Sequence, residues 1–380
     1  MTKGAILTLN AGSSSIKFGV YEAAPEPDLL LVGQVENLGP VAQLKLKGET
    51  ARDIGPADHA GGLRAILDAV APVLRGRDVV GVGHRIVHGG KSFAAPTRLT
   101  PEVMAQLTAL EPLAPLHQPH NLAAVRAAQE AFPHALQIGC FDTAFHVGHP
   151  LVNDIFALPR RFYEKGVRRY GFHGLSYDYI TSTLKRDYPE LYQGRVVVAH
   201  LGNGASICAI RNGRSIGSTM GFSALDGLPM GTRCGQLDPG ALLYLLEQGY
   251  STEAITRILY KESGLKGISG LSHDMRTLLA SDDPRAAEAI DYYVFRLRRE
   301  LGAMTAVLGG IDALVFCGGI GENAAPIRAR VLEGMEYLGL HPDAEANAKG
   351  GPLISSGPVP ALVIPTDEER VIARAVAALA

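Results

Sequence analysis

The sequence predicts an α/β protein made of two domains, each with a mixed β-sheet flanked by helices. Short hydrophobic runs typical of strands alternate with helical patterns along the whole chain. Strand–turn–strand segments at 6–21 and 196–210 make the sheets mixed rather than purely parallel. The second segment repeats the pattern of the first about half a chain away, and a length of 380 residues favours two domains over one.

The individual elements follow from these patterns. The hydrophobic runs expected as strands are 6–9, 16–21, 29–35, 79–82, 136–141, 196–199, 207–210, 313–316 and 362–364. The clearest helical pattern covers Pro284–Leu308, where apolar residues recur at helical spacing along one stripe. We interpret this stripe as the buried face of a core helix.

The balance of charges excludes broad classes of partner. Lysine and arginine number 36, against 38 aspartate and glutamate residues, so general attraction to nucleic acid or to a membrane surface is not expected. The four cysteines form no C-x-x-C pair and are interpreted as reduced thiols. No apolar stretch approaches the roughly 20 residues of a membrane span. We therefore expect a cytoplasmic protein that recognises charged groups only locally.

A hydroxyl-rich turn separates the first two expected strands. It reads Asn10-Ala11-Gly12-Ser13-Ser14-Ser15 and is followed by Lys17. Glycine lets backbone N–H groups approach an anion, while hydroxyl and ammonium groups add donors, so this composition is typical of a phosphate-binding turn. An ordinary hairpin turn would account for Gly12 but not for Lys17. The turn Gly202-Asn203-Gly204 holds the same place in the second segment, although chance similarity would also explain the repeat.

Two further glycine motifs are similar to known phosphate-binding patterns. Gly90-Lys91-Ser92 ends like a P-loop, but Arg85 stands where that motif needs its first glycine. Gly319-Ile320-Gly321-Glu322-Asn323-Ala324 follows a strand and matches a dinucleotide fingerprint, yet no clear following strand carries a ribose-binding acid. A helix N-terminus beside a nucleotide is the better interpretation of the second motif.

Several short motifs occur in one order from end to end of the chain. They are NAGSSSIK (10–17), GHRIVHGG (83–90), FDTAFH (141–146), YGFHG (170–174), HLGNG (200–204), GLPMGTRCG (227–235), GGIGEN (318–323) and IPTDEE (364–369). This ordered set resembles the acetokinase family, the acetate kinases, within the superfamily of acetate and sugar kinases, chaperone ATPases and actin. The resemblance implies two duplicated actin/ribonuclease H-like domains with the active site in the interdomain cleft. It implies a first domain of 1–145 plus 370–380 and a second of 146–369 that carries the nucleotide site.

The resemblance also implies an activity. Members of the family transfer the γ-phosphoryl group of ATP to acetate, reversibly, giving acetyl phosphate and ADP. The implied cofactors are Mg²⁺, with Mn²⁺ as an alternative, and ATP as co-substrate, and the implied assembly is a homodimer. The chemistry suits the residues, since a carboxylate nucleophile is already ionised at pH 7 and needs no strong base. What the site needs is cations and a metal ion that stabilise the phosphoryl group in flight.

Individual roles are carried over motif by motif. The implied catalytic residues are Arg85, Asp142, His173 and Arg233, of which Arg85 also holds acetate while His173 and Arg233 stabilise the transferring phosphoryl group. The residues implied around the methyl group are Val87, Leu116, Phe172 and Ala224. Those implied at the metal ion are Asn10 and Glu368, with Asp142 as a second matching acid. The residues implied at the nucleotide are Asn10, Ser13, Ser15, Lys17, His200, Leu201, Gly202, Asn203, Gly204, Asp274, Met275, Arg276, Gly319, Ile320, Gly321, Glu322 and Asn323.

Structural roles remain as alternatives for some of these residues. His173 would also fit as a buried core histidine, and His200 as an orienting neighbour or a structural residue. Thr366-Asp367-Glu368-Glu369 is also a capping box from Thr366 to Glu369, with acids in the first helical turn. Both readings of this segment are compatible if Glu369 caps the helix and Glu368 faces the substrates.

The sequence departs from the family pattern at several positions. Ala224 stands where proline is common, so we expect a looser pocket and propionate as a fair substrate. Met275 replaces a frequent aromatic residue beside the purine. The other departures are Gln118, His120, Leu175, Tyr177, Gln236 and Asp367. The histidine pairs 84/88, 117/120 and 146/149 have ligand-like spacing, but no cysteine or glutamate completes a zinc pattern.

Other functions compete with an acetate kinase. One is a propionate or short-chain fatty acid kinase, and another is a non-enzymatic, nucleotide-switched actin-like protein. A switch needs the phosphate turns but no cationic carboxylate site. The presence of Arg85, His173 and Arg233 therefore favours the enzyme.

Overall fold

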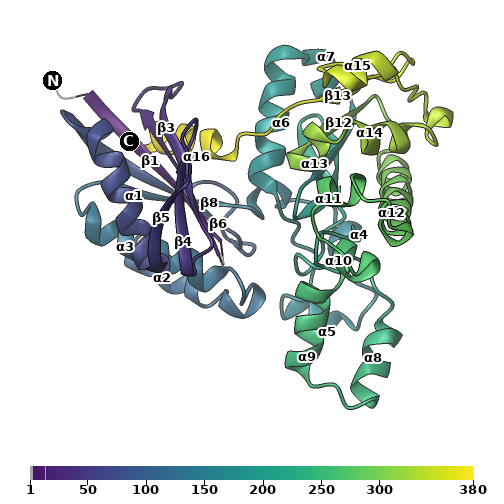
Figure 1. Cartoon of the computed structure of the whole chain (residues 1–380), viewed down its shortest axis with the longest axis horizontal. Coiled ribbons are helices and arrows are strands. Elements are labelled where there is room, and N and C mark those ends of the chain that lie inside the picture. Colours follow the sequence, from purple (N-terminus) through teal and green to yellow (C-terminus); the bar gives the residue numbers. More distant parts are fainter. Residues whose placement is uncertain (1–2, 13) are drawn as a thin grey trace. The chain divides into compact units, whose positions relative to one another are not determined.

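The computed structural model describes residues 3–12 and 14–380 (Figure 1). Contacts divide the chain into two compact units. The first contains the described residues up to Phe145 together with Asp367–Ala380, and the second is His146–Thr366. The chain returns to the first unit at Asp367, the N-cap of the last helix, rather than at the expected residue 370.

The first unit is built on a mixed sheet in the order β5-β4-β3-β2-β1-β6-β8-β7. Its strands are β1 Lys3–Ala11, β2 Ile16–Glu22, β3 Leu29–Glu36, β4 Gly39–Leu46, β5 Arg52–Ala57, β6 Arg77–Ile86, β7 Thr97–Arg98 and β8 Leu136–Phe141. Strands β1 to β5 pair antiparallel in succession, whereas β6 is parallel to both β1 and β8. The sequence analysis did not predict β4, β5 or β7. Strand β5 contains Gly55 and Pro56, which weaken a strand signal and are tolerated at a sheet edge.

Helices cover both faces of this sheet. They are α1 His59–Leu74, α2 Pro101–Thr108, α3 Gln118–Ala131 and α16 Glu368–Leu379, with a short 3-10 segment at Glu111–Leu113. Val82 packs in the core cluster that includes residues of α1 and α3. Side chains alternate along a strand, so the neighbouring Gly81 and Gly83 belong to the other face of the sheet. On that face, Val376 and Ile372 of α16 pack against these two glycines. The final helix therefore completes the first unit.

The second unit repeats the same design. Its sheet has the order β11-β10-β9-β12-β13, with β9 Arg195–Leu201, β10 Ala205–Arg211, β11 Arg214–Ser218, β12 Ala313–Cys317 and β13 Ala361–Val363. Two antiparallel pairings are followed by two parallel ones, as in the series β3-β2-β1-β6-β8 of the first unit. The predicted α/β class with two mixed sheets is confirmed, and the sequence echo at 196–210 is the second copy of the first hairpin.

The helices of the second unit surround its sheet. They are α4 Leu151–Asp154, α5 Arg160–Glu164, α6 Gly174–Asp187, α7 Pro189–Gln193, α8 Pro239–Glu247, α9 Thr252–Arg257, α10 Gly264–Ser269, α11 Met275–Leu279, α12 Pro284–Leu308, α13 Gly318–Asn323, α14 Ala325–Leu332 and α15 Ala344–Lys349. The predicted core helix is confirmed as α12, which begins at the N-cap Asp283 and ends at Gly309 with φ 71°. Within the described residues, none of the helices has the length and apolar character needed to cross a membrane.

Replacing Gly83 by alanine should loosen α16. A Cβ at this position would lie 2.3 Å from Ile372 Cγ2 and 2.8 Å from Val376 Cγ2, so the helix would have to move away from the sheet. We expect urea denaturation to show a loss of about 1–3 kcal/mol in the free energy of unfolding.

Gly302→Ala in α12 is the control for this substitution. A Cβ there would meet Tyr337 Oη at an ordinary 3.5 Å, and alanine favours a helix over glycine. We expect this variant to be as stable as the wild type or more stable. An equal loss of stability in both variants would contradict the close packing of α16 on Gly83.

Candidate active site

Two side chains from other elements hold the turn between β1 and β2. The turn closes on itself through a hydrogen bond of 2.8 Å from Gly12 N to Ser15 O. Asn121 Nδ2 donates to Ala11 O at 2.6 Å, and His59 Nε2 donates to Gly12 O at 2.7 Å. The carbonyl groups of the turn are therefore fixed from α3 and from the start of α1.

Asn10 and Lys17, the polar side chains that flank this turn, lie on one face of the sheet. Asn10 and Lys17 are opposite each other on β1 and β2, and directly opposed side chains project from the same face. Asn10 is buried, whereas Lys17 is exposed. Ser15 is half-buried, and the predicted residue Ser13 lies outside the described residues.

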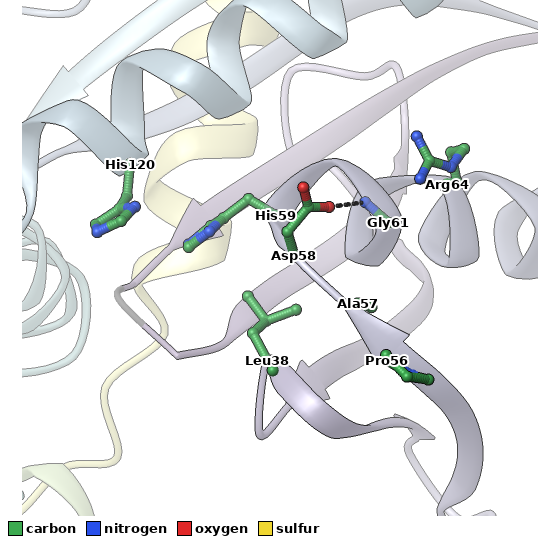
Figure 2. Close-up of a pocket in the computed structure, with 9 residues that line it drawn as sticks. Leu38, Pro56, Ala57, Asp58, His59, Gly61, Arg64 and His120 are labelled. Carbon is green, nitrogen blue, oxygen red and sulfur yellow. Dashed lines mark hydrogen bonds between the residues drawn. The ribbon is translucent and has the colours of Figure 1, made fainter.

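The surface of the first unit is hollowed next to His59 (Figure 2). The hollow has a volume of about 570 Å³ and is also lined by Leu38, Asp58, Arg64 and His120. The rings of His59 and His120 stack with centroids 4.5 Å apart. Burial, together with His59, lowers the pKa of His120. His59 therefore supports the first turn through Gly12 O, and His120 stacks on its ring.

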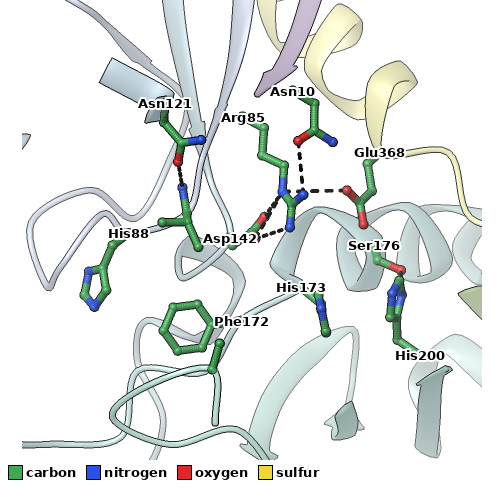
Figure 3. Close-up of polar contacts among 12 residues, drawn as sticks. Asn10, Arg85, His88, Asn121, Asp142, Phe172, His173, Ser176, His200 and Glu368 are labelled. Atoms are coloured by element: carbon green, nitrogen blue, oxygen red, sulfur yellow. Dashed lines mark hydrogen bonds and ion pairs between the residues drawn. The ribbon is translucent and has the colours of Figure 1, made fainter. Parts of the chain in front are cut away.

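Arg85 is the centre of a polar cluster in the first unit (Figure 3). It lies on β6, and its Nε donates to both oxygens of Asp142, at 2.9 and 3.1 Å, while Nη2 donates to Oδ2 at 2.6 Å. Arg85 Nη1 donates to Asn10 Oδ1 at 3.1 Å, and Glu368 Oε2 lies 3.8 Å from Arg85 Nε. The structure thus brings together two of the four predicted catalytic residues, Arg85 and Asp142, with the predicted metal ligands Asn10 and Glu368.

Burial governs the charges in this cluster. Burial disfavours the charged guanidinium group of Arg85, but Asp142 and Glu368 outweigh this effect and raise its pKa. Burial also raises the pKa of Asp142, and the neighbouring Arg85 opposes that rise. The pKa of Glu369 is raised by burial and by the nearby charge of Glu368, against the attraction of Lys17. Arg85 therefore remains positively charged, because two carboxyl groups surround it.

The segment after β6 is held by α3. Val87 N donates to Asn121 Oδ1 at 2.9 Å, so the side chain that binds the first turn also fixes Val87. Gln118 Oε1 accepts from His88 N at 3.2 Å, and its Nε2 donates to His88 O at 3.0 Å. Val87 is buried, and Leu116 is half-buried just before α3. The departure at Gln118 is thereby explained as a backbone clamp.

In the second unit, His173 occupies a strained backbone position. It is the N-cap of α6 and has φ 60° and ψ 25°, in the left-handed region that residues other than glycine rarely adopt. Its Nδ1 lies 2.9 Å from Ser206 Oγ on β10. The ring stacks on that of His200, with centroids 4.3 Å apart and an angle of 26° between the planes. His200 Nδ1 in turn lies 2.8 Å from Ser176 Oγ on α6.

The turn between β9 and β10 lies against these rings. A Cβ at Gly204 would lie 3.0 Å from His173 Nε2 and 4.0 Å from Arg233 Nη1. A Cβ at Gly202 would lie 3.9 Å from both His200 Nε2 and Gly319 N. A Cβ at Gly204 would crowd the His173 ring, whereas one at Gly202 would make ordinary contacts. The structure therefore gathers His173, His200 and Arg233 around the predicted phosphate turn.

The structure also places three further residues at or near this turn. Asn203 is exposed, and its carbonyl oxygen accepts from Gly231 N at 3.5 Å. Leu201 is buried at the end of β9. Arg233 is half-buried, and its Nη1 donates to Ala224 O at 3.3 Å.

The motif at 318–323 forms the short helix α13, directly after β12. Gly318 has φ 76° and packs on the backbone of Leu201, whereas a Cβ at Gly319 would meet open space. Ile320 is half-buried, and Gly321 is buried. Asn323 Nδ2 donates to Gly319 O at 2.9 Å.

Glu322 is turned inward. Its Oε1 accepts from Gly318 N at 2.9 Å and from Thr366 N at 3.1 Å. The carboxylate that the sequence analysis assigned to the nucleotide thus binds backbone N–H groups of the protein.

The segment Asp274-Met275-Arg276 differs in part from the sequence-based expectation. Asp274 caps α11, and Arg276 is 91% exposed on its side chain and pairs with Asp274 at 2.6 Å. That hydrogen bond lowers the pKa of Asp274 to about 2. Met275 is only 3% exposed. The side chain expected to pack against a purine therefore packs in the interior.

The predicted capping box is wrong. Asp367, not Thr366, is the N-cap of α16, and its Oδ1 accepts from Arg370 N at 3.0 Å. Aspartate ranks above threonine as an N-cap residue, and the helix starts one residue later than the box requires. Glu368 consequently opens the helix and is left to contact Arg85.

The residues predicted around the methyl group belong to both units. Val87 and Leu116 lie in the first unit, and Phe172 and Ala224 lie in the second. Phe172 is buried, and its carbonyl oxygen accepts from His146 Nε2 at 2.9 Å. Ala224 is half-buried and offers its carbonyl oxygen to Arg233.

Sequence reasoning missed the residues that hold the predicted ones in place. They are His59, Asn121, His146, Ser176 and Ser206. Each lies far along the chain from its partner, and nothing in a single sequence marks such pairs.

Acid should destabilise the protein through His84, which precedes Arg85 on β6. Its Nε2 donates to Gln137 Oε1 at 2.7 Å, and burial lowers its pKa from 6.5 to about 4. The folded state keeps this ring neutral, while the unfolded chain binds a proton below about pH 6.5. The stabilisation is therefore complete above that pH and is lost as the pH falls toward about 4.

Urea unfolding near pH 7.5 and near pH 5 measures this effect. We expect the wild type to lose about 2 kcal/mol more than His84→Gln between the two conditions. Identical losses in the two proteins would mean that His84 is not the group that titrates.

Comparison with known proteins gives one consistent family. The family model described as the acetokinase family matches residues 5–374. Acetate kinase from Methylocella silvestris is 53% identical over 98% of this chain and 97% of its own. Acetate kinase from Rhizobium meliloti is 46% identical over 99% and 98% of the two chains.

Solved structures agree with the sequence relatives. A propionate kinase from Francisella tularensis has a TM-score of 0.91 at 34% identity and covers 98% of both chains. An acetate kinase from Porphyromonas gingivalis has a TM-score of 0.87 at 39% identity and covers 97% of this chain and 98% of its own. With its sequence relatives and its fold in agreement over nearly the whole length, the chain belongs to the acetokinase family.

Proposed function

We propose that this protein transfers the γ-phosphoryl group of ATP to acetate, reversibly, and forms acetyl phosphate and ADP. Membership of the acetokinase family supports a kinase that acts on a carboxylate. The observation that carries the proposal furthest is the gathering of Arg233 Nη1 and His173 Nε2 at Gly204, in the turn that we propose binds a phosphate group.

Arg85 is the proposed acetate-binding residue. Asp142 holds its guanidinium plane by two-point hydrogen bonds. Each terminal nitrogen carries two hydrogens, so donors remain for a substrate carboxylate. The Arg85 side chain is 26% exposed, whereas Asp142 is 1% exposed. Asp142 thus orients the Arg85 guanidinium group, and the exposed part of the Arg85 side chain remains accessible to a substrate.

His173 and Arg233 are the proposed phosphoryl-stabilising residues. In phosphoryl transfer the charge spreads over the three oxygens of the group in flight, and fixed donors lower the barrier. Gly204 lets an anion approach both side chains, because a Cβ would occupy that space. The other nucleotide contacts proposed for this unit come from the turn 202–204 and from Gly319 to Asn323.

Asn10 and Glu368 are the proposed ligands of a Mg²⁺ ion. One or two carboxylate or amide oxygens, completed by phosphate oxygens and water, suit Mg²⁺. Both side chains contact the same guanidinium group, so their oxygens lie in one neighbourhood. When bound, the ion would neutralise charge on the nucleotide phosphates.

We also propose that the protein acts in the cytoplasm.

Arg233→Ala should abolish most of the activity. Loss of a fixed donor to the group in flight typically costs 10²–10³-fold in rate. The measurement is trapping of acyl phosphate as hydroxamate with ATP, Mg²⁺ and acetate, propionate or butyrate. Arg160→Ala is the matched control, because that side chain is 77% exposed on α5.

The outcomes of this assay separate the candidate functions. Acyl phosphate formed by the wild type and the control but not by Arg233→Ala supports the proposal. Measurable ATP binding without acyl phosphate from any acid would favour a nucleotide-switched protein instead.

Propionate is the proposed second substrate, because Ala224 leaves room where a proline ring would fill the pocket. The structural likeness to a propionate kinase supports a test of this substrate. We expect Ala224→Pro to lower kcat/KM for propionate relative to acetate by about 10-fold, within the range that one methylene in an apolar pocket provides. An unchanged ratio would remove Ala224 from the pocket.

A second copy of this chain is the proposed partner of α8. No residue of this apolar helix is buried, and Leu243 and Tyr244 are each 59% exposed. Exposed apolar patches of this kind mark protein–protein contacts.

Leu243→Glu with Tyr244→Glu should therefore give a monomer in analytical ultracentrifugation. Val41→Glu, at a residue of the first unit that is 56% exposed, is the control and should leave a dimer. A dimer in both variants would contradict the assignment to α8.

A further inference from the structure

The two stacked imidazoles of the second unit are held by a reciprocal pair of serines. His173 begins α6 and binds Ser206 of the β9–β10 hairpin, whereas His200 belongs to the hairpin and binds Ser176 of α6. In both cases the ring nitrogen used is Nδ1. Ser176 and Ser206 are each 0% exposed, so neither hydroxyl is shared with bulk water.

The nitrogen on the other side of each ring lies toward the phosphate turn. His173 Nε2 would be 3.0 Å from a Cβ at Gly204, and His200 Nε2 would be 3.9 Å from one at Gly202. The stacked rings therefore present two equivalent nitrogens to one glycine turn. A neutral imidazole carries its hydrogen on only one nitrogen, so what these atoms offer an anion depends on the tautomer.

Tyr177 is the residue from which we infer the direction of the hydrogen bonds at His173. Its hydroxyl group binds Ser206 Oγ, and burial raises its pKa well above the ordinary value, so the phenol keeps its proton. If Tyr177 donates to Ser206, the serine proton is directed to His173 Nδ1, and the ring hydrogen is placed on Nε2. At His200 the thiol of Cys317 lies 3.7 Å from Ser176 Oγ and 3.8 Å from Nδ1 of the ring itself.

We propose that Ser206, backed by Tyr177, and Ser176 are positioning residues that keep both histidines in the tautomer with N–H on Nε2. The proposal rests on the phosphoryl-transfer function proposed above. In this tautomer the rings direct two N–H donors at the turn, whereas the opposite tautomer would direct lone pairs at phosphoryl oxygens. His146 supports the same geometry from behind, since it donates to the carbonyl group of Phe172, the residue before His173.

The tautomers are measured directly by ¹⁵N–¹H correlation spectra of the full chain labelled at histidine. His173→Gln and His200→Gln assign the two sets of signals. We expect an unprotonated Nδ1 and a protonated Nε2 for both rings in the wild type. Ser206→Ala should shift the signals of His173 and populate the second tautomer, and Ser176→Ala should do the same to His200.

Kinetics give the second readout. We expect Ser206→Ala to lower kcat on the order of 100-fold, the lower end of the cost of a lost oxyanion donor, with the KM for acetate unchanged. Tyr177→Phe, which removes a single oxygen atom, should give a smaller loss in the same direction, and Ser206→Thr should restore activity. Ser269→Ala is the control, because this buried serine donates to the backbone carbonyl of Leu265 at 2.7 Å.

Three results would overturn the proposal. The first is a wild-type spectrum in which Nδ1 of His173 carries the proton, and the second is one in which both nitrogens do. The third is a loss of kcat in Ser206→Ala without any change in the His173 signals. If Ser206→Ala does not fold, Tyr177→Phe carries both measurements. Because the spectra need no turnover, a correct tautomer without acyl phosphate would refute the proposed function and leave the tautomer assignment standing.

Discussion

The ion pair between Arg85 and Asp142 fixes the geometry of the first unit's polar cluster. Removing both charges from water costs free energy, and the pair offsets this cost only while its hydrogen bonds stay well aligned. Asn10 and Glu368 contact the same guanidinium group. Strands β1 and β6, the segment after β8 and the first turn of α16 are therefore oriented around one planar cation, a role that suits arginine and not lysine.

The second unit is organised by hydrogen bonds to hydroxyl groups. Its glycine turn is surrounded by two imidazoles and one guanidinium, and the imidazoles are bound to serine hydroxyls. A carboxylate at these places would repel a phosphate group. Glu322 lies within the motif 318–323, and its carboxylate is bound to the backbone N–H groups of Gly318 and Thr366. The same strand order in the two units thus supports one site organised by an ion pair and another by hydroxyl groups.

The sequence predicted the parts of this architecture that depend on local patterns. Alternation of apolar residues located both hairpins, and helical spacing located α12 with its observed bounds. Local patterns were insufficient elsewhere, because tertiary contacts decided where a helix begins and which side chains are buried. Both Thr366 and Asp367 are good caps, and the contact of Glu368 with Arg85 fits the later start. The burial of Met275 cannot be predicted from the residues next to it in the sequence. Ser206 and His173 are 33 residues apart and come into contact only in the folded chain.

The packing of α16 has a consequence for the order in which the protein is made. A ribosome produces the sheet of the first unit early, but the helix that covers Gly81 and Gly83 follows the whole second unit in the chain. Domains made of one continuous segment can fold as they are synthesised. Here the second unit is continuous and the first is not. One face of the first sheet therefore stays uncovered while some two hundred further residues are added. The first unit begins to form before the second unit but is completed only after it.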